Sequence, residues 1–323
     1  MNWLDPDTMP VKLMLFVLMF AGLALSTSIP EAFGDKGIYF GAAYAFMQVF
    51  RSLFMLWAAK DRDPLTYIGF VRLTTWLATA SIFWIAGGLA EQTSHRIGLW
   101  LIALVIEYVS PVVGFWLPKI GRSEARDWVI SGEHMAERCA LFVIICLGET
   151  ILVNGGMIAK QPVTVLSVTT FSIAFLVTVT MWWIYFRYGH QNAAALIEET
   201  DDPGAVARHV FTYAHIPIVA GIILSAVSLE FIISNPLGNT DIKTAVAILG
   251  GPAVYLLGNI WFKGVVRRKI PLSHIGGLVL LGACVSLRSF LAPMELGGAV
   301  AGILLIVAIW EHRSLSPGEM VKP

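Results

Sequence analysis

Residues 137–158 read ERCALFVIICLGETILVNGGMI, and this segment decides the class of the fold. Beyond Arg138 it holds a single charged residue, Glu149. A helix of about 20 apolar residues is long enough to cross the hydrocarbon core of a bilayer, which is about 30 Å thick. Backbone N–H and C=O groups find no partner in that solvent outside the chain itself, so a crossing segment of this kind must be an α-helix. The segment therefore predicts a membrane-spanning helix.

Similar apolar runs recur along the whole chain. Hydrophobic residues make up 57% of the 323 residues, charged residues only 14%, and the mean hydropathy is +0.73. Soluble domains average about 25% charged residues, so most of this surface is expected to face lipid. The sequence predicts an all-α bundle of about ten spans in a single transmembrane domain, residues 1–323, with loops at 118–136 and 187–205. The predicted spans are 11–29, 37–59, 66–90, 97–117, 137–158, 162–186, 206–234, 244–262, 271–291 and 295–310.

Lysines and arginines are divided unevenly between the two sets of span ends. Fourteen fall on the side that holds both termini and five on the opposite side. Because cytoplasmic loops carry the excess of Lys and Arg, both termini are expected in the cytoplasm, with the chain in a bacterial plasma membrane. The acidic start of the chain, with Asp5 and Asp7, does not resemble the basic first part of a signal peptide.

Several other classes of protein leave patterns that this sequence lacks. Its longest basic run, residues 267–269, lies between two spans, so no nucleic-acid partner is expected. Phosphate-binding glycine loops, zinc-protease motifs and nucleophile elbows do not occur, so neither an enzyme activity nor a cofactor is expected. No metal site is expected either, because the ligand-like spacing of His134 and Glu137 has no second such pair.

Ionisable groups inside spans mark candidate functional positions. Each costs roughly 3 kcal/mol or more at mid-membrane unless it is paired or hydrated. Glu107, Glu149 and His215 are expected in one layer near the midplane, with Arg51 close to that layer. No lysine is expected in the middle of a span, and Lys263 is assigned to a span end.

The run around residues 134–149 also carries a stripe of charge along one helix face. His134 and Arg138 are one turn apart, and Glu149 follows Arg138 by eleven residues, which returns it to nearly the same face. One interpretation is a path for a proton, a cation or a polar solute. The other is a salt-bridged seam that fixes the register of the helices. Arg51, from a different span at similar depth, is the expected partner of Glu149.

Several strings resemble the low temperature requirement A (LtrA) family of bacterial membrane proteins. The most specific is HMAERCALFVIICLGETIL at residues 134–152, and the supporting strings are MWWIYF at 181–186, YAHIPIVAG at 213–221, EYVSP at 107–111 and NWLDP at 2–6. By this resemblance the family signature falls on Glu137, Arg138, Gly148, Glu149, His215 and Pro217. The resemblance implies a multi-pass membrane protein. The family name records a growth phenotype and implies no molecular activity.

Two features depart from the family pattern. Members usually begin with a helix that carries a Leu-Glu-Leu-Phe-Phe-Asp-Leu type motif, whereas the match here starts at Asn2. The chain therefore resembles a member that lacks its first two helices. Members also often have an acid after Tyr-Phe, where this chain has Arg187, and a role for an acid at that position is in doubt.

Three functions are compatible with these residues. The first is a carrier or channel-like protein for a small ion or polar solute, and the second is a structural or cold-adaptation factor of the membrane. The third and weakest is a membrane enzyme. Membrane lipid is an expected partner in each case. The residues of the candidate path are Glu149, Glu107, His215, Arg51, Arg138, Glu137 and His134.

The charge bias makes a prediction about topology. Reporter domains fused after Lys36 and after Arg268 are expected to lie on opposite sides of the membrane, the second in the cytoplasm. Alkaline phosphatase and fluorescent-protein fusions would measure this. Two fusions that report the same side would contradict the predicted number of spans.

Overall fold

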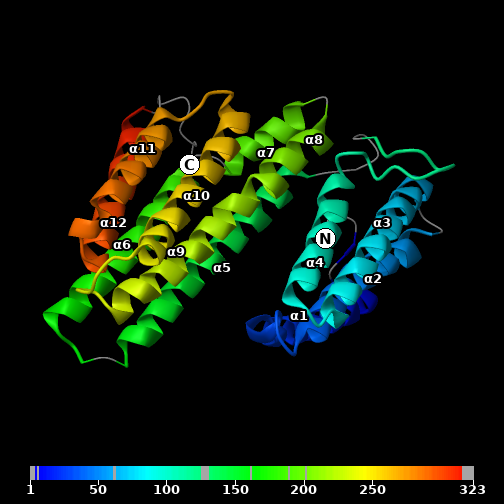
Figure 1. Cartoon of the computed structure of the whole chain (residues 1–323). Coiled ribbons are helices and arrows are strands. Elements are labelled where there is room, and N and C mark those ends of the chain that lie inside the picture. The colour runs from blue at the N-terminus through cyan, green and yellow to red at the C-terminus, as the bar shows by residue number, and fades with distance from the viewer. Residues whose placement is uncertain are drawn as a thin grey trace. The chain divides into compact units, whose positions relative to one another are not determined.

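The computed structural model describes residues 4–5, 7–60, 63–124, 131–160, 162–187, 190–200 and 202–314, and its regular elements are helices (Figure 1). In that part of the chain the β-type pairing is limited to an isolated bridge between Leu117 and Gly121. The predicted all-α class is confirmed. The chain divides into two compact units, residues 1–129 (unit 1) and 130–323 (unit 2), which are described separately. That the two form one membrane domain remains a prediction.

Unit 1 consists of four long helices and an irregular segment that follows them. The helices are α1 (Met9–Ser28), α2 (Gly37–Ala59), α3 (Pro64–Leu89) and α4 (Thr93–Val109), with a 3-10 turn, η1 (Ile29–Glu31), after α1. Consecutive helices pack against each other, α1 on α2, α2 on α3 and α3 on α4.

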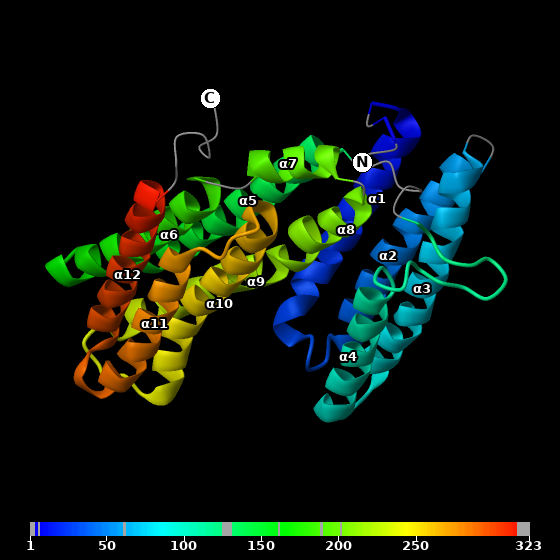
Figure 2. The same cartoon turned by 90° about the horizontal axis from the view of Figure 1, so that it is seen from above.

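Unit 2 is a larger helical bundle in which α9 and α10 lie side by side in both views (Figures 1 and 2). The end that holds the α10–α11 turn is predicted to be cytoplasmic and is called the inner end. The elements are α5 (Gly132–Ile158), α6 (Val165–Arg187), α7 (His190–Glu199), α8 (Pro203–Ala207), the π-helical turn η3 (Arg208–Tyr213), α9 (His215–Ser234), α10 (Ile242–Arg267), α11 (Leu272–Leu287), η4 (Arg288–Phe290) and α12 (Pro293–Ser314).

Nine helical segments among the described residues are long and apolar enough to cross a membrane, against the ten that the sequence predicts. The remaining predicted run, 97–117, contributes α4, which has only 17 residues. At 1.5 Å per residue α4 is about 25 Å long, the lower limit for a spanning helix. The predicted loop 187–205 contains α7 and the start of α8 instead.

The early end of α4 follows from Pro111. Proline has no N–H, so it cannot donate to the carbonyl of Glu107 four residues before it. The Ser110 hydroxyl takes this role and donates to Glu107 O at 2.9 Å. The chain then reverses through residues with positive φ, including Gly114 at 65° and Phe115 at 50°. The predicted helix 97–117 is therefore wrong beyond Val109.

Several helices begin at a side-chain cap. Asp63 accepts hydrogen bonds from the backbone N–H groups of Leu65 and Thr66 at the start of α3, and Asp241 accepts one from Thr244 at the start of α10. Hydrogen bonds from Thr66 lower the pKa of the Asp63 carboxyl, and those from Thr244 lower the pKa of Asp241. The N–H groups that a helix leaves unpaired at its first turn are thereby satisfied.

Small residues bring helices of unit 1 into close contact. A Cβ atom at Gly88 would lie 2.7 Å from Gly37 O, and one at Gly41 would collide with the Trp84 carbonyl oxygen. Spacing by four residues places Gly37 and Gly41 on one face of α2, which lies against α3.

The similar pair Gly298 and Gly302 lies in α12 of unit 2. A Cβ atom at Gly302 would meet no other atom within 4 Å, so this glycine makes no close helix contact.

In unit 1 the buried side chain of Arg96 ties the turns at one end of the helices together. Its guanidinium donates to the carbonyl oxygens of Gly34 and Ala90 at 2.7 Å and to those of Ala32 and Gly87 at 3.2 Å. A buried guanidinium is tolerated when its donors are bonded in this way. The predicted span 97–117 begins one residue after Arg96, so the sequence did not mark Arg96 as a buried residue.

In unit 2 the backbones of α9 and α10 also touch through glycines. A Cβ atom at Gly258 would lie 2.7 Å from Ile218 N, one at Gly251 would lie 2.6 Å from Ser225 Oγ, and one at Gly221 would collide with Tyr255 N. These three contacts are spread along both helices. They hold the α9–α10 pair at a short, fixed separation.

The glycine contacts predict opposite effects of the same substitution at two positions. Gly41→Ala should lower the free energy of unfolding by about 1–3 kcal/mol, because the new methyl group overpacks the α2–α3 contact. Gly302→Ala, the matched control in open space, should be neutral or stabilising by up to about 1 kcal/mol, since alanine favours a helix. Thermal unfolding in detergent would measure both. Equal stability of the two variants would contradict the α2–α3 contact.

Candidate functional site

Glu107 lies in unit 1 among aromatic side chains. Its Oε2 accepts a hydrogen bond from the Tyr44 hydroxyl and its Oε1 accepts one from Trp84 Nε1, both at 2.8 Å. The rings of Tyr44 and Trp84 are 4.4 Å apart between centroids, and Trp100 lies next to Trp84. The carboxylate is thus held by two neutral donors in a half-buried aromatic pocket.

Arg51 is connected to this pocket through two side chains of α2. Gln48 Nε2 donates to the Tyr44 hydroxyl at 3.1 Å, and Arg51 Nη2 donates to Gln48 Oε1 at 2.8 Å. Tyr44, Gln48 and Arg51 lie in the middle part of α2, so the expected proximity of Arg51 and Glu107 is found within unit 1. The expected pair of Arg51 with Glu149 would join the two units, and it remains a prediction.

His215 is buried in unit 2 and both of its ring nitrogens are bonded. Nε2 lies 2.8 Å from the Tyr185 hydroxyl and Nδ1 lies 2.8 Å from Val210 O, in the π-helical turn before α9. Phe262 packs edge-on against the His215 ring. Tyr185 is two residues from the end of α6, so His215 lies toward the inner end of the bundle.

Glu149 is not in the same layer as His215. Cys139 Sγ lies 3.5 Å from Phe211 O, which sets α5 and the segment leading to α9 at a common level. From that level Glu149 is ten residues further along α5 and His215 four residues further along its own segment. At 1.5 Å per residue, Glu149 is about 9 Å further from the inner end. The layer expected from the sequence is therefore not formed by these two residues.

The other candidates on α5 lie on its outer face. Glu137, Arg138 and Glu149 are exposed, and His134 is half-buried. Among the described residues Glu149 makes no hydrogen bond or ion pair that joins it to Arg138 or His134. Of the candidates in unit 2, only His215 belongs to the buried core.

A buried ion pair that the sequence did not indicate lies close to His215. Lys263 is 0% exposed and Glu311 is 1% exposed, and Lys263 Nζ lies 2.7 Å from Glu311 Oε2 and 2.8 Å from Oε1. The ammonium also donates to Ile184 O at 2.7 Å. The pair joins α10, α12 and α6. The predicted run 244–262 ends too early, because α10 continues to Arg267 and Lys263 lies within this helix near its end.

His274 of α11 completes this cluster. Its Nε2 lies 3.4 Å from Lys263 Nζ, and its Nδ1 lies 3.1 Å from the Ser273 hydroxyl. Both residues are buried. Phe262 and Tyr185, which contact His215, are the sequence neighbours of Lys263 and Ile184, so the two polar groups are adjacent along α6 and α10.

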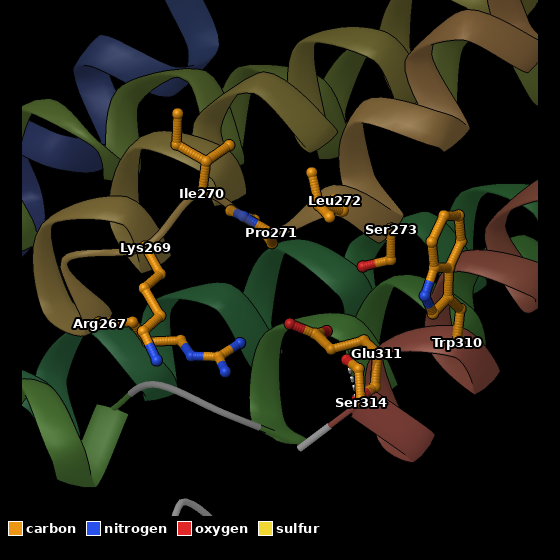
Figure 3. A pocket seen from close by; sticks show the side chains of 9 residues that line it. All are labelled: Arg267, Lys269, Ile270, Pro271, Leu272, Ser273, Trp310, Glu311 and Ser314. Carbon is orange, nitrogen blue, oxygen red and sulfur yellow. Dashed lines mark hydrogen bonds between the residues drawn. The ribbon is translucent and has the colours of Figure 1, made fainter. Parts of the chain in front are cut away.

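A cavity of about 310 Å³ opens beside the ion pair at the inner end of the bundle. Figure 3 shows the Glu311 carboxylate, the Ser273 hydroxyl and the Arg267 guanidinium around this space. Glu311 lines the cavity although it is almost fully buried, so its carboxylate closes the inner wall. Lys269 and Trp310 line the cavity further out.

Comparison with known proteins agrees with the sequence resemblance. The family model described as bacterial low temperature requirement A protein (LtrA) matches residues 1–309. The chain belongs to the LtrA family. A relative, the uncharacterized protein RA0937 of Rhizobium meliloti (strain 1021), is 45% identical over 315 residues, which cover 98% of this chain and 77% of the relative. No solved structure matches the chain.

Membership of the LtrA family and the apolar helices together make this a multi-pass membrane protein. The positions that the resemblance singles out, from Glu137 to Glu149 and at His215 and Pro217, all lie in unit 2, the unit that also holds the buried ion pair.

The buried pair makes a prediction about stability. Lys263→Met should lower the free energy of unfolding by about 3–5 kcal/mol, because it leaves the Glu311 charge buried without its counter-charge. The double variant Lys263→Met/Glu311→Met should recover much of that loss, since two apolar side chains of similar size fill the same space. Thermal unfolding in detergent would measure the recovery. Losses that simply add would contradict a direct pair.

Proposed function

We propose that this LtrA family member carries a small ion or polar solute across the bacterial plasma membrane, and that the Lys263–Glu311 pair is its binding site. The observation that carries the proposal is the position of Glu311. Its carboxylate holds a wholly buried ammonium and at the same time forms the inner wall of an open cavity. The proposal assigns the chain no enzymatic reaction.

Burial of this ion pair costs free energy, so the pair is expected either to bind a ligand or to hold the helices together. Taking two ions out of water costs several kcal/mol per ion, and their attraction repays that cost only with good geometry and further hydrogen bonds. The Ile184 carbonyl and His274 supply such contacts to Lys263. A carboxylate in this position can accept a proton or a ligand from the cavity, and it then releases the ammonium.

His215 belongs to the proposed path as a neighbour of the pair. It contacts Tyr185 and Phe262, and these two residues are the sequence neighbours of Ile184 and Lys263. Glu107 and Arg51 in unit 1, and His134, Glu137, Arg138 and Glu149 on α5, stay candidates for other parts of a path.

A structural or cold-adaptation factor is the second candidate. The observation in its favour is that both oxygens of Glu107 and both ring nitrogens of His215 are bonded within the chain. Groups whose hydrogen bonds are all satisfied within the chain can hold helices in register without taking part in transport. The two candidates differ in whether removing a paired charge abolishes transport or only changes stability.

Flux into liposomes tests the carrier proposal. The purified protein, reconstituted with a trapped pH-sensitive or potassium-sensitive dye, should pass protons or a monovalent cation faster than empty liposomes. The double variant Lys263→Met/Glu311→Met should keep the fold and lose this flux, because no charge is left at the cavity wall. The matched control is Lys36→Met/Glu31→Met, which removes the partly exposed pair of unit 1 and should leave flux unchanged.

Two results would count against the proposal. Native flux in the folded Lys263/Glu311 double variant would remove the pair from the path. A native protein that passes neither protons nor monovalent cations, and whose single variants change only the melting temperature, would favour the structural candidate.

A further inference from the structure

The cavity beside the Lys263–Glu311 pair, called the inner cavity, has one basic wall. Arg267, at the end of α10, and Lys269, in the turn that follows, both line it. Figure 3 shows these two side chains on one side of the space, with Glu311 and Ser273 on the other. A ligand with negative charge would therefore meet two cationic groups on the same wall.

The carboxylate of Glu311 does not cancel this charge. Both of its oxygens lie within 2.8 Å of Lys263 Nζ, so its own charge is already matched by a buried ammonium. The lining residues together with Lys263 thus carry three cationic groups and one carboxylate. A hollow lined mainly by one sign of charge attracts ions of the opposite sign, here an anion.

The start of α11 adds backbone donors to the basic wall. Leu272 and Ser273, the first two residues of this helix, line the inner cavity, and no side chain caps the helix. The first N–H groups of a helix have no partner within it, and phosphate oxygens are well suited to accept from them. Arginine and lysine also bind phosphate through charge-assisted hydrogen bonds. The donors around the cavity therefore match a phosphate group.

The rest of the cavity lining is apolar and faces outward. Ile270, Leu272 and Trp310 line the inner cavity and are also 62%, 68% and 47% exposed. In a multi-pass membrane protein such side chains contact lipid, and tryptophan in particular is enriched at the level of the headgroups. This rim offers contacts to the acyl chains of a phospholipid, which a soluble phosphate compound does not have.

The predicted topology places the inner cavity at the leaflet that holds anionic lipids. Its basic residues belong to the turn between α10 and α11, which the distribution of Lys and Arg assigns to the cytoplasm. The cytoplasmic leaflet carries negative surface charge, and basic pockets between spans on that side bind lipid headgroups. A volume of about 310 Å³ is enough for a headgroup, while the acyl chains would stay outside.

We propose that the inner cavity binds the headgroup of an anionic phospholipid of the cytoplasmic leaflet. The phosphate lies between the basic wall, formed by Arg267 and Lys269, and the start of α11, and the acyl chains leave along Ile270 and Leu272. A soluble phosphate compound shares the phosphate chemistry and differs by lacking the chains. The inference goes beyond the carrier function and does not depend on it, because lipid binding is measured without any flux.

Native mass spectrometry of the full chain in detergent tests this site. Phosphatidylglycerol should bind with saturation, and phosphatidylcholine, which has the phosphate but no net charge, should bind about tenfold more weakly. Lys269→Gln removes one charge from the exposed part of the wall and should weaken phosphatidylglycerol binding about fivefold. The matched control is Arg313→Gln, which removes an exposed charge at the same end of unit 2 outside the cavity lining and should change the affinity less than about twofold.

Three results would overturn the proposal. Equal binding of phosphatidylcholine and phosphatidylglycerol would show that the site does not recognise negative charge. Glycerol 3-phosphate bound as tightly as phosphatidylglycerol would make the cavity a site for a soluble phosphate compound. An unchanged affinity in Lys269→Gln, or an equal loss in Arg313→Gln, would mean that the lipid does not bind at the basic wall.

Photo-crosslinking locates the bound lipid independently of any substitution. Phosphatidylglycerol with a photoreactive group at the headgroup end of one acyl chain should crosslink to the peptide around Ile270 and Leu272 or to Trp310. Excess unlabelled phosphatidylglycerol should abolish this crosslink, whereas the same excess of phosphatidylcholine should leave most of it. Crosslinks confined to other helices, or competition by both lipids alike, would contradict the site.

Discussion

A polar group in hydrocarbon can find a partner only within the chain, and this constraint determines most of the structure. Backbone groups meet it by forming helices, and Ser110 meets it for a carbonyl that Pro111 leaves open. Side chains meet it by converging: Arg96 on four carbonyl oxygens, and Lys263 on Glu311 and Ile184 O. Among the described residues a few buried side-chain atoms have no hydrogen-bond partner within the chain, such as Asn154 Oδ1 and Asn259 Oδ1.

The helices could be predicted from the sequence because the signal for each one is local. An apolar run of sufficient length specifies a span without knowledge of its neighbours, and nine of the runs correspond to long helices among the described residues. The end of α4 was missed because the hydropathy of residues 110–117 continues past Pro111, and a stop by a single proline does not change the average. Helix α7 was missed because its polar residues resemble a loop.

The candidate site could not be predicted in the same way because it depends on contacts between distant residues. Lys263 and Glu311 are 48 residues apart, and each lies just beyond the predicted end of its run. A charge at that position looks like an ordinary interfacial residue until the helices are assembled. The segment before α9 was also incomplete, because the spanning segment begins at Pro203 with α8 and the π-helical turn and not at residue 206. Glu107 and Arg51 are linked through Tyr44 and Gln48, whereas the pairing of Arg51 with Glu149 that the sequence suggested stays a prediction.

The glycine contacts between α9 and α10 also have a mechanical consequence. Two helices whose backbones touch at three levels cannot slide past each other without a clash at one of them, and they lose packing at all three if they separate, so they behave as one rigid unit. The Lys263–Glu311 ion pair joins the inner part of α12 to this unit, and protonation of Glu311 would weaken it. Any rearrangement that follows protonation of Glu311 should therefore be borne by α12, while α9 and α10 serve as the fixed frame against which it moves.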